Sequence, residues 1–184
     1  MKNYGQCVDV VLDEIIRSMR AVDPSNVDLL VDKIIRAPRV FCDGHGRSGL
    51  QASDFAVRLM QLGIETYIAS ELTTPAIRQG DLLIICSGSG ETESLVGHAK
   101  KAKSFGVDIV LISASEESSI NKFSQMSILI PADTKLRYDA SSTQPLGNLF
   151  EQSLKLLLDI VAIMIAEKLG VSNDDMSERH KNLE

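Results

Sequence analysis

The chain has 184 residues, of which 44% are apolar and 24% charged, and its formal net charge is −6 at pH 7. This length is enough for one domain with a full core, and the composition is typical of a globular protein that dissolves in water. The negative charge and the lack of a basic cluster argue against nucleic acid as the main partner. We also expect no membrane partner, because no apolar run is long enough to cross a bilayer.

The cysteines indicate a reducing compartment and no metal site. Cys7, Cys42 and Cys86 are odd in number and have no metal-ligand spacing. Two of them fall near the ends of expected strands, where buried thiols are common. The N-terminus has a helical pattern with acidic residues rather than the pattern of a signal peptide. We therefore expect a cytoplasmic protein that uses no metal.

The chain reads as a single domain, 1–184. Residues 1–36 are expected to form a pair of amphipathic N-terminal helices that packs on the core or on another subunit, and Pro24 is well placed to start the second helix. An α/β core, 37–170, follows, and 171–184 form a C-terminal tail. Strands are expected at 39–42, 66–69, 82–86, 107–112 and 126–130, and core helices at 50–62, up to 104, near 118–123 and at 149–169. This alternation predicts a parallel, doubly wound sheet flanked by helices.

The strand expected at 82–86 ends in a Ser/Gly-rich turn, and a helical segment opens directly after it. Its glycines allow the backbone to approach a ligand closely, and the start of a helix offers unpaired amide N–H groups to an anion. Three hydroxyls add donors for phosphate oxygens, those of Ser87, Ser89 and Thr92. The turn holds no Lys or Arg, so it suits a monophosphate rather than a Walker A nucleotide. An ordinary tight turn with hydroxyl helix caps is the alternative.

A second Gly-rich turn, Gly44–Gly49, also follows a strand and precedes a helix. It satisfies G-x-G-x-x-G, and Glu71 lies where a dinucleotide site would place a ribose-binding acid. Because both turns follow parallel strands, we expect them to be neighbours over one pocket. Arg47 and Ser48 are within reach of phosphate there. His45 is interpreted as a loop histidine beside the site, and the sequence leaves open whether it touches a ligand.

The two turns together resemble those of the sugar isomerase (SIS) domain family, through Gly46-Arg47-Ser48 in one and the string from Ser87 to Thr92 in the other. Within it, the chain is similar to the 6-phospho-3-hexuloisomerases. The stretches that carry this second resemblance are 71–77, 144–152 and the tail from Arg179 to Glu184. The first of these accounts for Glu71 as part of a Glu-x-x-Thr-Pro stretch, which lowers the weight of the dinucleotide interpretation.

The resemblance implies a flavodoxin-like three-layer sandwich with a five-stranded parallel sheet, working as a homotetramer with sites at subunit interfaces. It implies an isomerase that interconverts 3-hexulose 6-phosphate and fructose 6-phosphate through a cis-enediol, in the ribulose monophosphate pathway of formaldehyde assimilation, with no cofactor. The resemblance implies that phosphate is bound by Ser48, Ser87, Ser89 and Thr92. It implies catalytic roles for Glu151 and His180. It also implies substrate contact by Gly46, Arg47 and Gly88.

Several alternatives stay open. Glu151 is equally well placed for an ion pair with Lys155 or as an ordinary acid of a first helical turn. His180 is either a solvated tail histidine or one that reaches a neighbouring subunit's pocket, and His98 is interpreted as a surface residue. The rival functions are another aldose–ketose phosphate isomerase, such as one for arabinose 5-phosphate, a non-catalytic phosphosugar-binding regulator, and a dinucleotide-dependent oxidoreductase.

Overall fold

The computed structural model describes residues 2–134, 142–180 and 182. Five parallel strands form one sheet in the order β2-β1-β3-β4-β5. The strands are β1 (Val40–Gly44), β2 (Thr66–Ile68), β3 (Leu82–Cys86), β4 (Asp108–Ser113) and β5 (Met126–Leu129). The helices are α1 (Tyr4–Arg20), α2 (Pro24–Arg36), α3 (Gly46–Gln61), α4 (Glu93–Ser104), α5 (Asn148–Leu169) and α6 (Asn173–Glu178).

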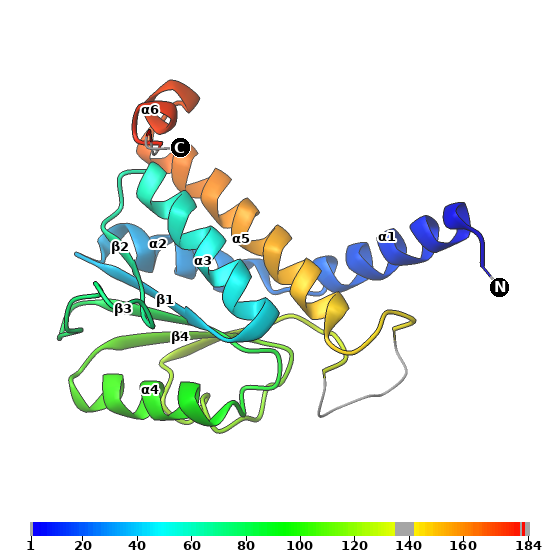
Figure 1. Ribbon diagram of the computed structural model, residues 1–184, viewed down its shortest axis with the longest axis horizontal. Coiled ribbons are helices and arrows are strands. Elements are labelled where there is room, and N and C mark those ends of the chain that lie inside the picture. The colour runs from blue at the N-terminus through cyan, green and yellow to red at the C-terminus, as the bar shows by residue number, and fades with distance from the viewer. Residues whose placement is uncertain (1, 135–141, 181, 183–184) are drawn as a thin grey trace.

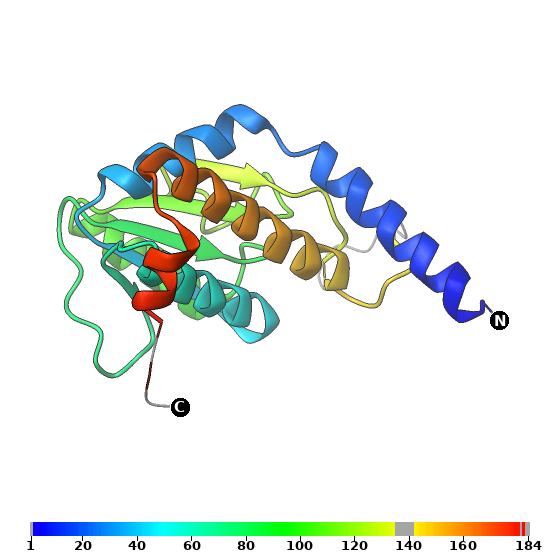
Figure 2. The same cartoon turned by 90° about the horizontal axis from the view of Figure 1, so that it is seen from above.

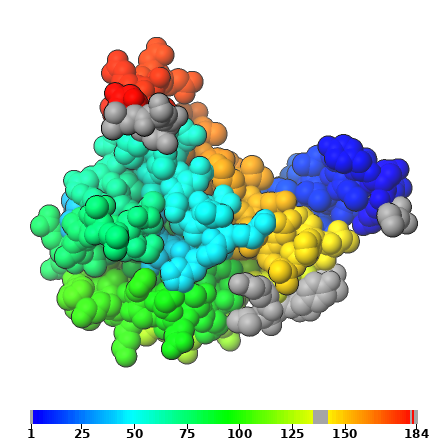
Figure 3. Space-filling model, viewed as in Figure 1, coloured from blue at the N-terminus to red at the C-terminus, as the bar shows by residue number. Residues whose placement is uncertain are grey.

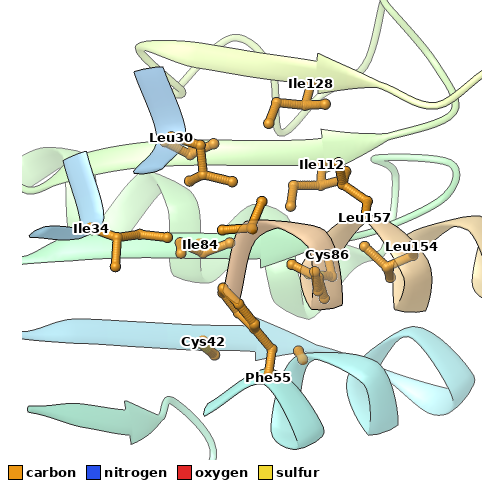
Figure 4. Close-up of a cluster of buried hydrophobic side chains, with 14 of the residues drawn as sticks. Leu30, Ile34, Cys42, Phe55, Ile84, Cys86, Ile112, Ile128, Leu154 and Leu157 are labelled. Carbon is orange, nitrogen blue, oxygen red and sulfur yellow. The ribbon is translucent and has the colours of Figure 1, made fainter. Parts of the chain in front are cut away.

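Two apolar layers hold the sheet between its helices. Helices α2, α3 and α5 cover one face and α4 covers the other (Figure 1). Because successive strand residues point to opposite faces, Ile84 belongs to the first layer and Ile85 to the second. Figure 4 shows the first layer, where Leu30 of α2 and Leu157 of α5 meet strand side chains. The predicted flavodoxin-like three-layer sandwich is confirmed, and the observed strand order is the one typical of flavodoxin-like sheets.

The two N-terminal helices are placed differently from each other. Helix α2 is part of the core, because Val27, Leu30, Val31 and Ile34 are all buried. Helix α1 packs against α5 and projects from the body of the molecule (Figures 1 and 2). Figure 3 shows it standing out as a lobe of its own. The expected pair is therefore divided between the core and a projecting arm.

The helices differ from the prediction in three places, and several strand ends differ by one or two residues. Helix α3 begins at Gly46, four residues earlier than expected, so the Gly-Arg-Ser turn is the first turn of the helix itself. The helix expected near 118–123 is a series of turns, stabilised by the Asn121 side chain donating to the Glu116 carbonyl at 2.7 Å. The tail contains α6, which begins with a capping box between Ser172 and Asp175. Short segments of this kind have too few turns to show a helical apolar period.

Among the described residues, no helix is both long and apolar enough to cross a membrane.

Two neighbouring leucines of α2 give a matched test of its place in the core. Leu30 is completely buried and Leu29 is 52% exposed. We expect Leu30→Ala to lower the free energy of unfolding by about 2–5 kcal/mol, because it leaves a cavity in the core. Leu29→Ala removes the same atoms from the surface and is expected to cost less than about 0.5 kcal/mol. Urea unfolding followed by circular dichroism measures both, and equal losses would contradict this placement of α2.

Candidate functional site

The two Gly-rich turns meet where the strand order changes direction. β1 pairs with β3 along its whole length, and Gly44 at the end of β1 lies opposite Cys86 at the end of β3. In doubly wound sheets such a switch point is where ligands bind. A cavity of about 170 Å³ opens there between α3, α4 and α5. Eight of the nine predicted site residues line it, namely Gly46, Arg47, Ser48, Ser87, Gly88, Ser89, Thr92 and Glu151.

The hydroxyls of the Ser/Gly turn keep their hydrogens available. Ser87 Oγ accepts from the Gly90 N–H at 3.1 Å, and Ser89 Oγ accepts from the Glu91 N–H at 3.2 Å. Thr92 is the N-cap residue of α4, yet its side chain makes no cap hydrogen bond. All three hydroxyls can therefore donate into the cavity, beside the amide groups at the start of α4.

Glycine at position 88 brings this turn close to α5. A β-carbon at Gly88 would lie 3.1 Å from Cδ1 of Phe150, which is tighter than an ordinary contact. Any larger residue would push the turn and the first turn of α5 apart. The close approach places Glu151, which follows Phe150, across the cavity from the turn hydroxyls.

Arg47 holds the Glu151 side chain. Its Nε donates to Glu151 Oε2, and its Nη2 donates to Asn148 Oδ1 at 2.6 Å. The Glu151 side chain is 15% exposed, so this ion pair is partly withdrawn from water. The alternative of an ion pair between Glu151 and Lys155 is wrong, because Lys155 instead pairs with Asp54 and Asp159.

A buried carboxylate of α1 anchors the loop before α5. Glu14 is only 6% exposed and accepts from Ser142 Oγ at 2.6 Å, from Thr143 N–H at 2.8 Å and from Gln144 Nε2 at 3.1 Å. Gln144 Oε1 in turn accepts from Asn148 Nδ2 at 2.7 Å. Hydrogen bonds therefore run from Glu14 through Gln144 and Asn148 to Arg47 and Glu151. We refer to these five residues as the α1–α5 network.

Sequence reasoning missed Glu14, which the helical pattern assigned to the polar side of its helix. The two buried residues of α1 are Glu14 and Ser18, one helical turn apart. Ser18 Oγ donates to the Pro131 carbonyl at 2.8 Å. The buried stripe of α1 is thus polar, and the one available signal is the i,i+4 spacing of these two residues. Burial raises the pKa of Glu14, but its hydrogen bonds from Ser142, Thr143 and Gln144 outweigh burial and lower the pKa to about 2.

Two histidines lie beside the turn that follows β1. His45 lines the cavity, and its Nδ1 is 2.9 Å from the Gly44 carbonyl oxygen. His98 of α4, expected to be a simple surface residue, has a 45% exposed side chain whose Nδ1 is 2.7 Å from Oδ2 of Asp43. Asp43 is 1% exposed, at the end of β1. Its pair with His98 connects β1 to α4, and so connects the elements that carry the two Gly-rich turns.

His180 is the predicted site residue that this cavity does not include. Its Nδ1 is 2.8 Å from Nε2 of Gln61, the last residue of α3, whereas Ser48 is in the first turn of that helix. At 1.5 Å per residue the two ends are about 20 Å apart. Within one chain, His180 therefore lies at the opposite end of α3 from Glu151.

Other cavities do not gather the same chemistry. A larger one, about 820 Å³, lies between α1 and the ends of β4 and β5, and is lined by Arg17, Glu116 and Glu117 among others. Glu71 lines a further cavity of about 230 Å³ with Asp43 and His98, away from Ser48 and the turn hydroxyls. This placement removes the support that Glu71 gave to a dinucleotide site. In the part of the chain that the structure describes, no group of three or more His, Cys, Asp or Glu side chains is arranged to hold a metal.

The SIS domain family model matches residues 33–146. The chain belongs to the SIS domain family. It is 40% identical over 176 residues to a 3-hexulose-6-phosphate isomerase of Bacillus subtilis, with 95% of each chain covered. It is 36% identical to the 3-hexulose-6-phosphate isomerase of Mycobacterium gastri, covering 96% of this SIS chain and 89% of that enzyme.

A solved relative has the same architecture over nearly the whole chain. The crystal structure of a Methanococcus jannaschii protein, from which a molecular function of 3-hexulose-6-phosphate isomerase was inferred, superposes with a TM-score of 0.85 at 34% identity. The superposition covers 96% of this chain and 98% of that protein. The family assigned from the two turns is therefore confirmed.

Glu14→Gln tests the anchor of the α1–α5 network. A pKa of about 2 in place of 4.5 means that the hydrogen bonds favour the folded chain by about 3 kcal/mol. This contribution is complete above pH 4.5 and is lost as pH falls towards 2. We therefore expect Glu14→Gln to lower the free energy of unfolding by about 3 kcal/mol at pH 7, and the difference from wild type to shrink between pH 5 and pH 3.

The neighbouring exposed residue gives the control, since Asp13→Asn changes the same charge on the same helix. Denaturant titrations of all three proteins at several pH values measure the effect. A deficit in Glu14→Gln that stays constant with pH would contradict the role assigned to the carboxylate.

Proposed function

We propose that this SIS protein is an isomerase that interconverts 3-hexulose 6-phosphate and fructose 6-phosphate through a cis-enediol. The observation that carries the proposal is the cavity at the sheet's switch point, where the Glu151 carboxylate faces a hydroxyl-rich turn. The similarity to the Bacillus subtilis and Mycobacterium gastri isomerases, over nearly the full chain, supports the choice of sugar. The two sugars differ only in whether the carbonyl is at carbon 3 or carbon 2, so one phosphate site serves both.

We assign phosphate binding to Ser48, Ser87, Ser89 and Thr92. Their hydroxyls converge on the cavity from the starts of α3 and α4, where unpaired amides and the helix dipoles favour an anion. Gly46 and Gly88 keep the backbone of both turns open to the phosphate. Arg47 is assigned to substrate contact as well as to holding Glu151, because its guanidinium is 64% exposed at the cavity.

Glu151 is assigned as the base. Its carboxylate takes the proton from carbon 2 of 3-hexulose 6-phosphate, and the electron pair of that bond forms the carbon 2–carbon 3 double bond while the carbon 3 oxygen gains a proton. The glutamic acid then returns its proton to carbon 3, and the carbon 2 oxygen loses its proton as the new carbonyl forms. No cofactor takes part, and a partly desolvated carboxylate can perform both transfers.

We propose a homotetramer in which His180 of one subunit enters the pocket of another and exchanges protons between the sugar oxygens. Large apolar side chains exposed along α3 and α5 support an oligomer, since such patches usually mark interfaces. They include Leu50, Val57, Met60, Leu156, Ile160 and Ile163. A cytoplasmic location is part of the same proposal, and the buried free thiols of Cys42 and Cys86 are compatible with it.

A coupled assay with Glu151→Gln tests the reaction and its base. A hexulose-phosphate synthase supplies 3-hexulose 6-phosphate from ribulose 5-phosphate and formaldehyde, and glucose-phosphate isomerase and glucose-6-phosphate dehydrogenase report fructose 6-phosphate as NADPH. We expect Glu151→Gln to lower kcat by about 100-fold or more, because an amide cannot take the proton. Glu167→Gln, an exposed change near the far end of the same helix, should retain full activity.

A wild-type protein inactive in this assay would contradict the proposed substrate. Arabinose 5-phosphate is then the next sugar to try, and binding of sugar phosphates without turnover would indicate a regulator. Full activity in Glu151→Gln would keep the reaction and reject the assigned base.

Mixed oligomers test the donation of His180 between subunits. Glu151→Gln and His180→Ala are each expected to be nearly inactive alone. If every pocket takes Glu151 and His180 from different subunits, co-assembly of the two variants regenerates intact pockets, about a quarter of them for random mixing. Co-expression of the two chains with different affinity tags, followed by the coupled assay, measures the recovery. The absence of any recovery in verified mixed oligomers would show that both residues act from one chain.

A further inference from the structure

The anion site described above has few positive charges for a phosphate dianion. Two of the described residues that line the cavity can carry a positive charge, Arg47 and His45. Arg47 already donates to Glu151 and Asn148. The four hydroxyls and the helix amides supply hydrogen bonds but only partial charges. His45 is therefore the side chain whose charge is not already neutralised by a carboxylate in the cavity.

The geometry of His45 fixes which ring nitrogen can meet a ligand. Its Nδ1 is 2.9 Å from the Gly44 carbonyl oxygen, and a carbonyl can only accept, so Nδ1 carries a hydrogen. A neutral ring held in this way has a bare lone pair at Nε2, which repels an anionic oxygen. Only the doubly protonated ring has an N–H at Nε2 that can donate to an anion.

His45 takes its position from the start of α3, where its ring lies beside a second histidine. It is the N-cap residue of α3, in extended conformation, and its ring lies edge-on to the ring of His98 with centroids 6.4 Å apart. The bond between His98 and the buried Asp43 fixes the orientation of this second ring. The charged and titratable groups around His45 are His98, which is paired with Asp43, and Arg47, Asp133 and Glu151, which line the same cavity.

We propose that His45 is a ligand of the substrate's phosphate, donating from Nε2 as an imidazolium ion and supplying a full positive charge to the anion site. This inference rests on the proposed function only in taking the phosphate of a sugar phosphate as the anion. It gives the site a pH dependence of its own: dianions bind more tightly where the ring is protonated and more weakly as the ring loses its charge.

Sulfate is the probe that isolates this effect, because it stays a dianion between pH 6 and pH 8 whereas phosphate itself titrates there. We would measure sulfate binding by isothermal titration calorimetry at constant ionic strength, with fructose 6-phosphate as competitor to show that the two share the site. Four proteins are compared, namely wild type, His45→Ala, His45→Lys and His98→Asn. The last is the matched control, since it changes a neighbouring histidine that does not line this cavity.

We expect His45→Ala to raise the sulfate Kd about tenfold at pH 6, the effect of one charge-assisted hydrogen bond. Wild-type affinity should be lower at pH 8 than at pH 6, whereas the affinity of His45→Ala should be the same at both. His45→Lys keeps a positive charge and should bind sulfate at both pH values with little difference. His98→Asn should retain most of the affinity and the pH dependence.

Equal sulfate affinity in wild type and His45→Ala, or no competition between sulfate and fructose 6-phosphate in wild type, would overturn the inference. The binding experiment does not depend on turnover. Sulfate binding that needs His45 in a protein without isomerase activity would reject the proposed function and keep this inference. Full isomerase activity in wild type, together with an unchanged sulfate affinity in His45→Ala, would keep the proposed function and reject this inference.

Discussion

Parallel pairing of β1 with β3 is the constraint on which the rest of the site depends. The pairing runs from Val40 opposite Leu82 to Gly44 opposite Cys86, so both strands end at the same level of the sheet. Helices α3 and α4 start from these two ends and cover opposite faces (Figure 1). Their unpaired amides and positive dipole ends are therefore concentrated at one edge. The topology alone therefore favours anion binding at this edge, which supports the proposed phosphate site.

The side of the pocket that carries Glu151, the proposed base, is built by a different kind of interaction. Glu151 reaches the cavity from α5, and the α1–α5 network holds it through polar contacts that begin at Glu14. The fully buried residues of helix α1 are Glu14 and Ser18, and Met19 packs partly buried against the core. The helix is therefore held by apolar packing and by buried hydrogen bonds together. Buried hydrogen bonds add little to stability unless every donor has an acceptor, so this contact requires one particular geometry. In this account the projecting helix positions the acid/base group as well as packing on the core.

Local sequence pattern was enough to predict the strands, the longer helices and the two Gly-rich turns, because each depends on residues close in the chain. Glu151 was assigned through the resemblance to the SIS family, and the pattern alone left its role open. The partners of Glu14 could not be predicted, since they lie about 130 residues away on a loop with no periodicity. The same is true of Asp43 and His98, which come from separate elements. The pattern placed His180 in the tail, but its distance from the pocket follows from α3, along which Ser48 and Gln61 are about 20 Å apart. Contacts between distant elements are decided by tertiary packing.

The most direct test of the central claim is a crystal structure of the protein with bound fructose 6-phosphate. The account predicts the phosphate among the hydroxyls of Ser48, Ser87, Ser89 and Thr92, with a Glu151 carboxylate oxygen about 3 Å from carbons 2 and 3 of the sugar. A sugar phosphate bound instead in the larger cavity beside Arg17, or with its reacting carbons far from Glu151, would contradict it.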